Sequence, residues 1–369
     1  MGVPYLLVKQ TIRMVGKKSG VIILFISLFW GCSKNNPTEM YVPTPYSLEI
    51  PPLFQQKIIK PVIPIDNPLT VEGIALGKKL FFDKQLSADG TLACADCHKP
   101  ENAFADENQF SRGINNTLGT RNAMPLFNLA WNYSERFAWD GKELSLERQA
   151  LEPVVSAQEM HNTWFNVVNT LQVDPQYPEL FNQAFGSVII DSVKVTKAIA
   201  QFERTLISAN SKFDNYLNGT ASLTTEELNG FEVFMDETRG DCFHCHGSNN
   251  NPLWTDNAFH NNGLDTNFTD LGLGAVSGDP ADNGKFRSPS LRNLAFTAPY
   301  MHDGRFTTLD EVIDHYSEGL QFSATIDPLM KKVNEGGVQL SEKDKTDLKA
   351  FLLTLTDEAF RNNIDFHSK

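Results

Sequence analysis

Apolar residues recur at helical spacing in several stretches of the chain. Residues 70–83 combine an apolar face with two glycines that permit close packing, and Thr224-x-x-Glu227 forms a capping box ahead of a second apolar stretch. Residues 341–356 place apolar side chains at i, i+3, i+4 and i+7, namely Leu348, Phe351, Leu352 and Leu355. These patterns predict three amphipathic helices and a mainly α-helical protein.

The N-terminus has the pattern of an export signal. Residues 1–31 contain four basic residues and no acidic one, and their apolar run, Val21–Trp30, is short for a membrane span. We interpret residues 1–31 as a signal peptide. Cys32 follows Gly31 and is similar to the lipidated cysteine of bacterial lipoproteins, so we expect a lipid anchor on Cys32. Ordinary signal cleavage beside an incidental cysteine is the alternative.

A proline-rich segment follows the signal. Residues 33–68 hold eight prolines, which favour extended backbone over regular structure. We therefore predict that residues 32–68 form a tether between the anchor and the folded protein.

Composition and charge narrow the class of protein. The 369 residues are 41% hydrophobic and 21% charged, which is typical of globular proteins, and the length suggests two domains. The formal net charge is −13, and no cluster of basic residues opposes it. Nucleic acid is therefore not expected as a partner.

Two cysteine motifs carry the clearest chemistry in the sequence. They read Cys94-Ala95-Asp96-Cys97-His98 and Cys242-Phe243-His244-Cys245-His246. Cys-x-x-Cys-His attaches c-type haem, because the two thiols add to the two vinyl groups and the histidine binds one face of the iron. We expect two covalently bound c-type haems with His98 and His246 as iron ligands. A zinc site and disulfides are the alternatives.

Each haem motif follows a predicted helix, and further helices come later in the chain. This arrangement predicts two cytochrome c-like haem domains packed together. We place the N-terminal domain at residues 69–218 and the C-terminal domain at residues 219–369, with the boundary near Asn218-Gly219-Thr220.

Further motifs carry a specific resemblance to a known family. They are Leu76–Asp83, Gly119–Asn122, Trp139–Lys142, Glu159–Met160, Ser290–Asn293 and Thr297–Gly304. With the two haem motifs, these stretches resemble the bacterial di-haem cytochrome c peroxidase family, including its MauG-like branch. The resemblance spans residues 66–356.

The resemblance implies different roles for the two haems. The N-terminal haem would react with peroxide and the C-terminal haem would transfer electrons, with Trp139 as the bridge between them. Glu159 matches the family's distal glutamate and Gln149 another position of the peroxide pocket. A carboxylate whose pKa is raised in a dry pocket can move a proton between the peroxide oxygens.

A calcium ion and arginines paired with the haem propionates are also expected near the haems. The family binds calcium between its domains, and its ligands match the side chain of Asn122 and the backbone carbonyls of Thr297 and Pro299; oxygen ligands suit this hard cation. Pairing with haem propionates is the role considered for three arginines, Arg121, Arg287 and Arg292.

The sequence differs, near the first haem motif, from those members of the family that must be activated by reduction. Those members carry a histidine on the loop before the motif Gly119–Asn122, where it blocks the peroxide-binding iron. No histidine occurs between His98 and His161. We expect an N-terminal haem that is open to peroxide in the diferric protein.

The second iron ligand of the C-terminal haem also departs from the common pattern. Many family peroxidases use a methionine fourteen residues after the histidine of the Pro-Tyr-x-His segment, whereas the MauG-like branch uses tyrosine. The residue fourteen positions after His302 is Tyr316. We expect Tyr316 to bind this iron, with His315, Met301 and Met330 as alternatives.

The leading interpretation is an exported, periplasmic di-haem peroxidase, anchored to a bacterial membrane. It would reduce hydrogen peroxide to water with electrons from a small cytochrome, a cupredoxin or a protein substrate. Two alternatives stay open. One is a MauG-like enzyme that oxidises a protein side chain through high-valent haems, and the other is a non-enzymatic di-haem electron carrier. A homodimer is also considered.

Overall fold

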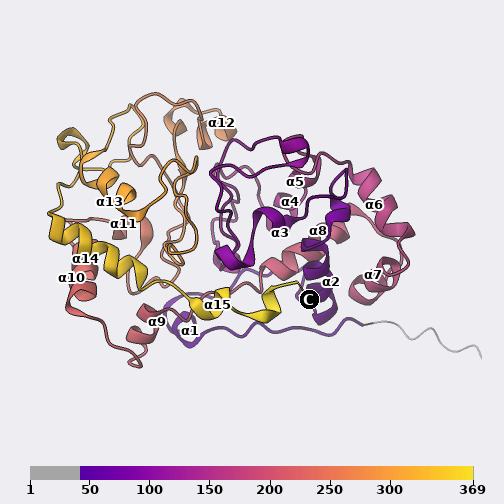
Figure 1. Ribbon diagram of the computed structural model, residues 1–369. Coiled ribbons are helices and arrows are strands. Elements are labelled where there is room, and N and C mark those ends of the chain that lie inside the picture. The colour runs from indigo at the N-terminus through magenta and orange to yellow at the C-terminus, as the bar shows by residue number, and fades with distance from the viewer. Residues whose placement is uncertain (1–41, 369) are drawn as a thin grey trace, which may run out of the picture. The chain divides into compact units, whose positions relative to one another are not determined.

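The computed structural model describes residues 42–368, which form two helical lobes joined by long loops (Figure 1). The first lobe contains α2 (Val71–Phe81), α3 (Cys94–Cys97), α4 (Leu146–Gln149), α5 (Glu152–Val155), α6 (Trp164–Val173), α7 (Tyr177–Phe185) and α8 (Ser192–Glu203). The second contains α9 (Lys212–Leu217), α10 (Thr225–Met235), α11 (Phe243–His246), α12 (Leu273–Ser277), α13 (Leu309–Glu318) and α14 (Glu342–Leu353). The expected mainly helical fold is confirmed.

Strand structure in the described residues is slight. β1 (Phe259–His260) and β2 (Phe286–Arg287) pair antiparallel in a two-stranded sheet within the second lobe. Within residues 42–368, no helix is both long enough and apolar enough to pass through a lipid bilayer.

A pair of closely packed helices organises the core of the first lobe. α2 lies within the predicted helical stretch 70–83 and begins at its cap Thr70, whose side chain accepts a hydrogen bond from the backbone of Gly73. α2 lies against α8 so closely that a Cβ added at Gly77 would be 1.9 Å from the carbonyl oxygen of Ala198. The contact therefore requires glycine.

The second lobe repeats this arrangement. α10 begins with the predicted capping box of Thr224 and Glu227 and packs against α14. A Cβ added at Gly230 of α10 would lie 1.9 Å from the carbonyl oxygen of Asp347 in α14. The same glycine-to-carbonyl contact in both lobes supports two domains of one architecture.

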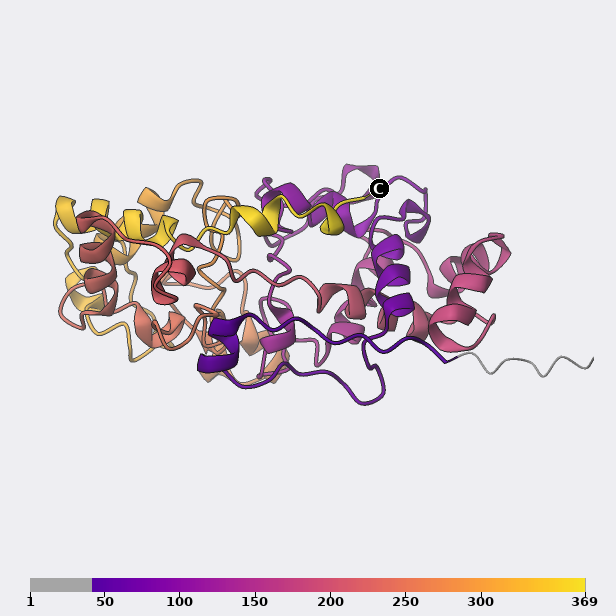
Figure 2. The ribbon, with the colours of Figure 1, turned by 90° about the horizontal axis from the view of Figure 1, so that it is seen from below.

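The domain boundaries differ from the prediction at two places. α9, which a boundary at residue 218 assigns to the first domain, instead buries Phe213 in the core of the second lobe, with ring centroids 5.2 Å from Phe351. α15 (Glu358–Arg361) follows the second lobe but buries Phe360 in the first-lobe core. Figure 2 shows this yellow segment running from the second lobe onto the first. Long-range aromatic packing, which local turn signals do not report, sets these boundaries.

The tether prediction is wrong for the described part of its segment. Residues 52–57 form α1 (Pro52–Lys57), and Leu53 and Phe54 are buried against Trp131. Thr44 donates hydrogen bonds to Glu72 from both its backbone and its side chain. The prolines allow an extended path, but the apolar residues between them anchor that path to the protein surface.

Candidate functional site

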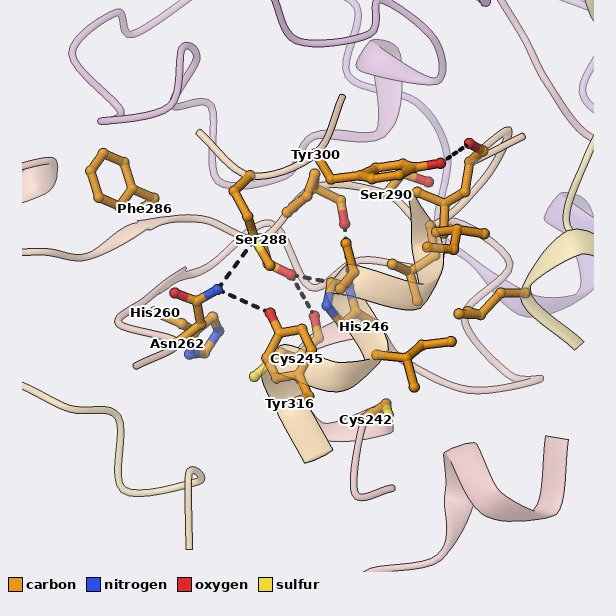
Figure 3. Close-up of a pocket in the computed structure, with 18 of the residues that line it drawn as sticks. Cys242, Cys245, His246, His260, Asn262, Phe286, Ser288, Ser290, Tyr300 and Tyr316 are labelled. Carbon is orange, nitrogen blue, oxygen red and sulfur yellow. Dashed lines mark hydrogen bonds between the residues drawn. The ribbon is translucent and has the colours of Figure 1, made fainter. Parts of the chain in front are cut away.

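The second cysteine motif opens onto a cavity of about 210 Å³. A second cavity, of about 30 Å³, has room for little more than water. Cys242, which precedes α11 (Phe243–His246), and Cys245 and His246 within that helix line the larger one (Figure 3). The Nδ1 atom of His246 lies 3.2 Å from the carbonyl oxygen of Pro289, which fixes the ring. Burial lowers the pKa of His246 to about 4 and keeps the imidazole neutral, as an iron ligand must be.

Tyr316 of α13 lines the same cavity. Its hydroxyl accepts a hydrogen bond from the side-chain amide of Asn262 at 3.0 Å, and burial raises the pKa of the phenol to about 12. His315 is buried beside it, with Nε2 3.3 Å from the carbonyl oxygen of Asn262, and is not among the cavity-lining residues. The structure therefore brings together Tyr316 and His246, while Met301 and Met330 also line the cavity.

The first cysteine motif occupies α3 and the residue after it. The Nδ1 atom of His98 lies 3.1 Å from the carbonyl oxygen of Phe104, so this ring too is fixed by a backbone acceptor. Burial lowers the pKa of His98 and raises the pKa of Cys97 to about 11. The two motifs lie in different lobes and all four of their cysteines are free, which argues against a shared zinc site and against disulfides.

The expected peroxide-pocket residues follow one another on α4, α5 and the turn after them. Gln149 ends α4, and Glu159 lies in a turn closed by a hydrogen bond from its backbone to the carbonyl of Ser156. Burial raises the pKa of the Glu159 carboxyl, and its charge acts on the thiols of Cys94 and Cys97. Glu159 is thus close enough to the first haem motif for its charge to be felt by the two thiols.

A histidine-free loop supports this glutamate. The backbone N–H of Ile114 donates to the carbonyl of Glu159 at 3.0 Å. A Cβ added at Gly113 would lie 2.1 Å from the carbonyl oxygen of Gln158. The loop before the motif Gly119–Asn122 therefore packs on the backbone that carries Glu159.

Trp139 lies where the two lobes meet. Its side chain is 8% exposed and lines the same cavity as His246. The indole Nε1 of Trp139 donates to the carbonyl of Asn122 at 2.8 Å. The backbone carbonyl of Trp139 accepts from the N–H of Arg287 at 2.9 Å. Residues of both lobes therefore hold Trp139 at the edge of the second haem cavity.

The three residues expected to bind calcium border this cavity as well. Asn122, Thr297 and Pro299 are among its lining residues. The Asn122 amide nitrogen donates to the carbonyls of Asn108 and Gln109, at 3.1 and 3.3 Å, which leaves its oxygen as the free end. Three oxygen donors of this kind suit a hard cation.

Of the three arginines considered for haem propionates, Arg287 fits best. Arg292 is buried in a bidentate ion pair with Asp214, so the expectation for it is wrong. Arg121 pairs with two carboxylates. Arg287 is 7% exposed and lines the cavity, its Nε has no partner among the described residues, and burial lowers its pKa to about 10. An anionic group such as a haem propionate would satisfy this buried cation.

Two cavity residues were not anticipated. Asn262 holds the Tyr316 hydroxyl, although the two are 54 residues apart in sequence. His260 also lines the cavity, with Nδ1 2.6 Å from Asp327 and Nε2 2.9 Å from Asp256. These carboxylates outweigh desolvation and, with Cys245, raise the pKa of His260 to about 11. Neither residue stands in a pattern that reveals these contacts.

Comparison with known proteins identifies the family. A family model described as di-haem cytochrome c peroxidase matches residues 71–222. The chain is 36% identical to the methylamine utilization protein MauG of Methylophilus methylotrophus, over 88% of this chain and 94% of that protein. It is 34% identical to cytochrome-c peroxidase IdrP1 of Pseudomonas sp. (strain SCT), over 80% of this chain and 83% of that one. The chain belongs to the di-haem cytochrome c peroxidase family.

A solved structure of a member of the family agrees in fold. A MauG-like protein associated with microbial copper homeostasis superposes with a TM-score of 0.79 at 36% identity, covering 87% of this chain and 99% of that one. The expectation of two cytochrome c-like domains agrees with this likeness. Membership of the di-haem cytochrome c peroxidase family also implies two c-type haems, one for each Cys-x-x-Cys-His motif.

Proposed function

We propose that this protein is a periplasmic di-haem peroxidase that reduces hydrogen peroxide to two molecules of water, using two electrons that enter through the C-terminal haem. One observation carries the proposal. Glu159 presents a half-buried carboxyl, whose pKa is raised by desolvation, near the first haem motif. The family relationship supports the same conclusion.

Each haem has a defined set of residues to hold it. Cys94 and Cys97 would form the thioether links of the N-terminal haem and His98 would bind its iron. Cys242, Cys245 and His246 would do the same for the C-terminal haem, and Tyr316 would be the second protein ligand of its iron. When bound, haem supplies the electrons and the metal centre at which the peroxide O–O bond is broken.

Glu159 acts as the proton carrier of this reaction. As a carboxylate it accepts a proton from one peroxide oxygen, and as an acid it delivers that proton to the other, which leaves as water. Gln149, at the end of α4, supplies a neutral amide that orients peroxide by hydrogen bonding. The absence of histidine from residues 99–160 leaves the distal side to these two residues.

Electrons pass between the lobes by way of Trp139. The donor is a small cytochrome, a cupredoxin or a protein substrate, and it docks on the second lobe. Calcium bound by Asn122, Thr297 and Pro299 stiffens the region where the lobes meet.

Export and membrane attachment complete the proposal. The signal peptide at residues 1–31 and the lipid on Cys32 fall outside the described residues, and the sequence alone supports them. Labelling of the expressed protein with a radioactive fatty acid tests the anchor, which Cys32→Ser should abolish. Size-exclusion chromatography with light scattering tests the homodimer.

Peroxide turnover by the holoprotein tests the function. With a reduced small-molecule donor, the protein should consume one peroxide for every two electrons, and EPR of the isolated protein should contain a high-spin ferric signal. A protein with two haems but no peroxide turnover, and with only low-spin signals, would be an electron carrier instead.

One observation favours a second candidate function, the peroxide-dependent oxidation of a protein side chain. Tyr316, the anionic ligand of the MauG-like branch, lines the second haem cavity and is held there by Asn262. A phenolate stabilises oxidised iron and opposes reduction by a high-potential donor. If this function is correct, peroxide added without donor produces a spectral change at both haems that lasts for seconds or longer, and Tyr316→Met abolishes it.

A further inference from the structure

A carboxylate of the long segment 247–284 pairs with a residue of the first lobe. Asp270 forms a bidentate ion pair with Arg121, with Nε–Oδ2 and Nη2–Oδ1 distances of 2.7 and 2.9 Å. The pair is partly buried, with side-chain exposures of 28% for Asp270 and 23% for Arg121. Bidentate geometry fixes the plane of the guanidinium as well as its position.

Arg121 holds a second carboxylate with its remaining nitrogen. Its Nη1 lies 2.6 Å from Oδ2 of Asp140, the residue after Trp139. Beneath the guanidinium lies the ring of Phe286, 5.7 Å from the Arg121 Cζ. Two nitrogens of Arg121, Nε and Nη2, therefore bind a residue of the second lobe. The third, Nη1, binds the segment that carries Trp139.

The contacts of Trp139 run parallel to this ion pair. Asn122, the neighbour of Arg121, accepts the indole hydrogen bond of Trp139, while Arg121 itself binds Asp140, the neighbour of Trp139. The consecutive residues Arg121 and Asn122 thus bind the consecutive residues Asp140 and Trp139. Loss of the Asp270 pair would leave the guanidinium of Arg121 free to rotate away from Asp140, which directly follows Trp139 in the chain.

We propose that Asp270 is a positioning residue for Trp139, which it orients through Arg121 and Asp140 so that an electron passes rapidly between the two haems. The inference rests on the proposed function, because it takes Trp139 as the bridge. The step transfers one electron from the iron that is oxidised to the iron that is reduced, without making or breaking a bond. It gives segment 247–284 a role in the reaction.

The experiment measures the rate of electron redistribution between the haems of the holoprotein after flash photolysis of the half-reduced, carbon monoxide-bound form. Asp270→Asn keeps the shape of the side chain but removes its charge, and Asp270→Ala removes the carboxylate altogether. Both should slow the redistribution at least tenfold while both haem midpoint potentials, from spectroelectrochemistry, stay unchanged. Asp270→Glu should restore most of the rate.

A matched control comes from the same segment. Asp265 forms a bidentate pair with Arg305, with both distances 2.9 Å, and is exposed to a similar degree. Asp265→Asn should leave the redistribution rate within twofold of the wild type. Equal slowing by Asp265→Asn would overturn the inference, since it would reflect general loosening of the segment.

The remaining outcomes separate this inference from the proposed function. Trp139→Phe should slow the redistribution; an unchanged rate refutes the bridge and with it the electron path of the proposed function. Slowing by Trp139→Phe together with unchanged rates in both Asp270 variants refutes the role of Asp270 alone. If both variants lose haem or fold, Asp270 supports the fold and the positioning role is wrong.

Discussion

The side-chain amide of Asn262 donates a hydrogen bond of 3.0 Å to the hydroxyl of Tyr316, and both residues line the cavity at the second haem motif (Figure 3). The same amide nitrogen lies 3.6 Å from the sulfur of Met301. Asn262 therefore contacts two candidate iron ligands at once. Replacement of each candidate in turn distinguishes them.

Replacement of Tyr316 should alter the C-terminal haem and leave the other haem unchanged. In Tyr316→Met, a neutral thioether replaces an anionic donor, so the midpoint potential of this haem should rise by 100 mV or more, on the order of the range over which axial ligands act. Tyr316→Phe should change its optical and EPR spectra. Spectroelectrochemical titration of the purified protein measures both effects.

Two controls accompany the Tyr316 variants. His315→Gln and Met301→Leu should leave the ligand field of the C-terminal haem intact, because His315 is not among the cavity-lining residues and its Nε2 lies against the carbonyl of Asn262, while Met301 has a competitor in Tyr316. An unaltered spectrum in Tyr316→Phe, or a large change in either control, would assign the ligand elsewhere.

Glu159→Gln should slow the reaction with peroxide by roughly 100-fold or more, since proton transfer contributes on the order of 10²–10⁴-fold. The carboxylate form must accept the first proton. Burial raises the pKa of Glu159 above its ordinary value of 4.5, so the wild-type rate should be full at high pH and fall as the pH drops through that raised pKa. Stopped-flow mixing with peroxide measures the second-order rate constant across pH.

Glu152→Gln is the matched control for Glu159. Glu152 lies on the neighbouring α5 but is half exposed and paired with Lys142. Its replacement should preserve the rate at high pH and move the pH profile toward lower pH, because the charge of Glu152 contributes to the raised pKa of Glu159. A Glu159→Gln protein that retains the wild-type profile would show that another group carries the proton.

Glu203 gives the first lobe a pH-dependent stability. It is 3% exposed, one carboxyl oxygen has no partner among the described residues, and burial raises its pKa to about 8 from 4.5. The folded state therefore holds the proton more tightly than the unfolded state. Protonated Glu203 contributes fully to the free energy of unfolding below pH 4.5. This contribution is lost as the pH rises to about 8, by about 1.4 kcal/mol for each pH unit.

Chemical denaturation of wild type and Glu203→Gln tests this linkage. The wild-type free energy of unfolding should fall between pH 5 and pH 8, and the slope should be smaller in Glu203→Gln, which cannot ionise. The exposed Glu179 of α7 offers a control, because Glu179→Gln should keep the wild-type slope. Identical slopes in all three proteins would mean that Glu203 does not titrate in this range.

Removal of calcium should loosen the region around Trp139. Asn122, one of the three proposed calcium ligands, lines the cavity and accepts the indole hydrogen bond of Trp139 on its backbone carbonyl. Chelation should lower the melting temperature, and calcium at about 100 times its dissociation constant should restore about 2.7 kcal/mol. Magnesium should not, because it requires a tighter octahedral site. Calorimetry that detects no calcium binding would contradict the assignment.

The sequence predicts those parts of the molecule that depend on local chemistry. The haem motifs, the cap at Thr70 and the capping box at Thr224 are readable because their residues lie within a few positions of one another. The position of α9 and the anchoring of α1 are not readable, because Phe213 and Phe54 find their partners far along the chain.

In the cavity, too, features set by local sequence can be predicted and those set by long-range packing cannot. Tyr316 could be located by its distance from His302, a spacing inherited with the family motif. The Asn262 contact, the orphaned Nε of Arg287 and the two carboxylates around His260 depend on three-dimensional packing. No single stretch of residues contains this information.

The segment after α14 has a consequence for how the protein can be divided. Phe360 and Phe366 pack on Phe104, whose carbonyl fixes His98, and Asp357 accepts hydrogen bonds from residues 208–210. The proximal side of the first haem is therefore completed by residues that lie more than 250 positions downstream. A first lobe cut off before residue 357 would thus lack side chains that support its own haem motif.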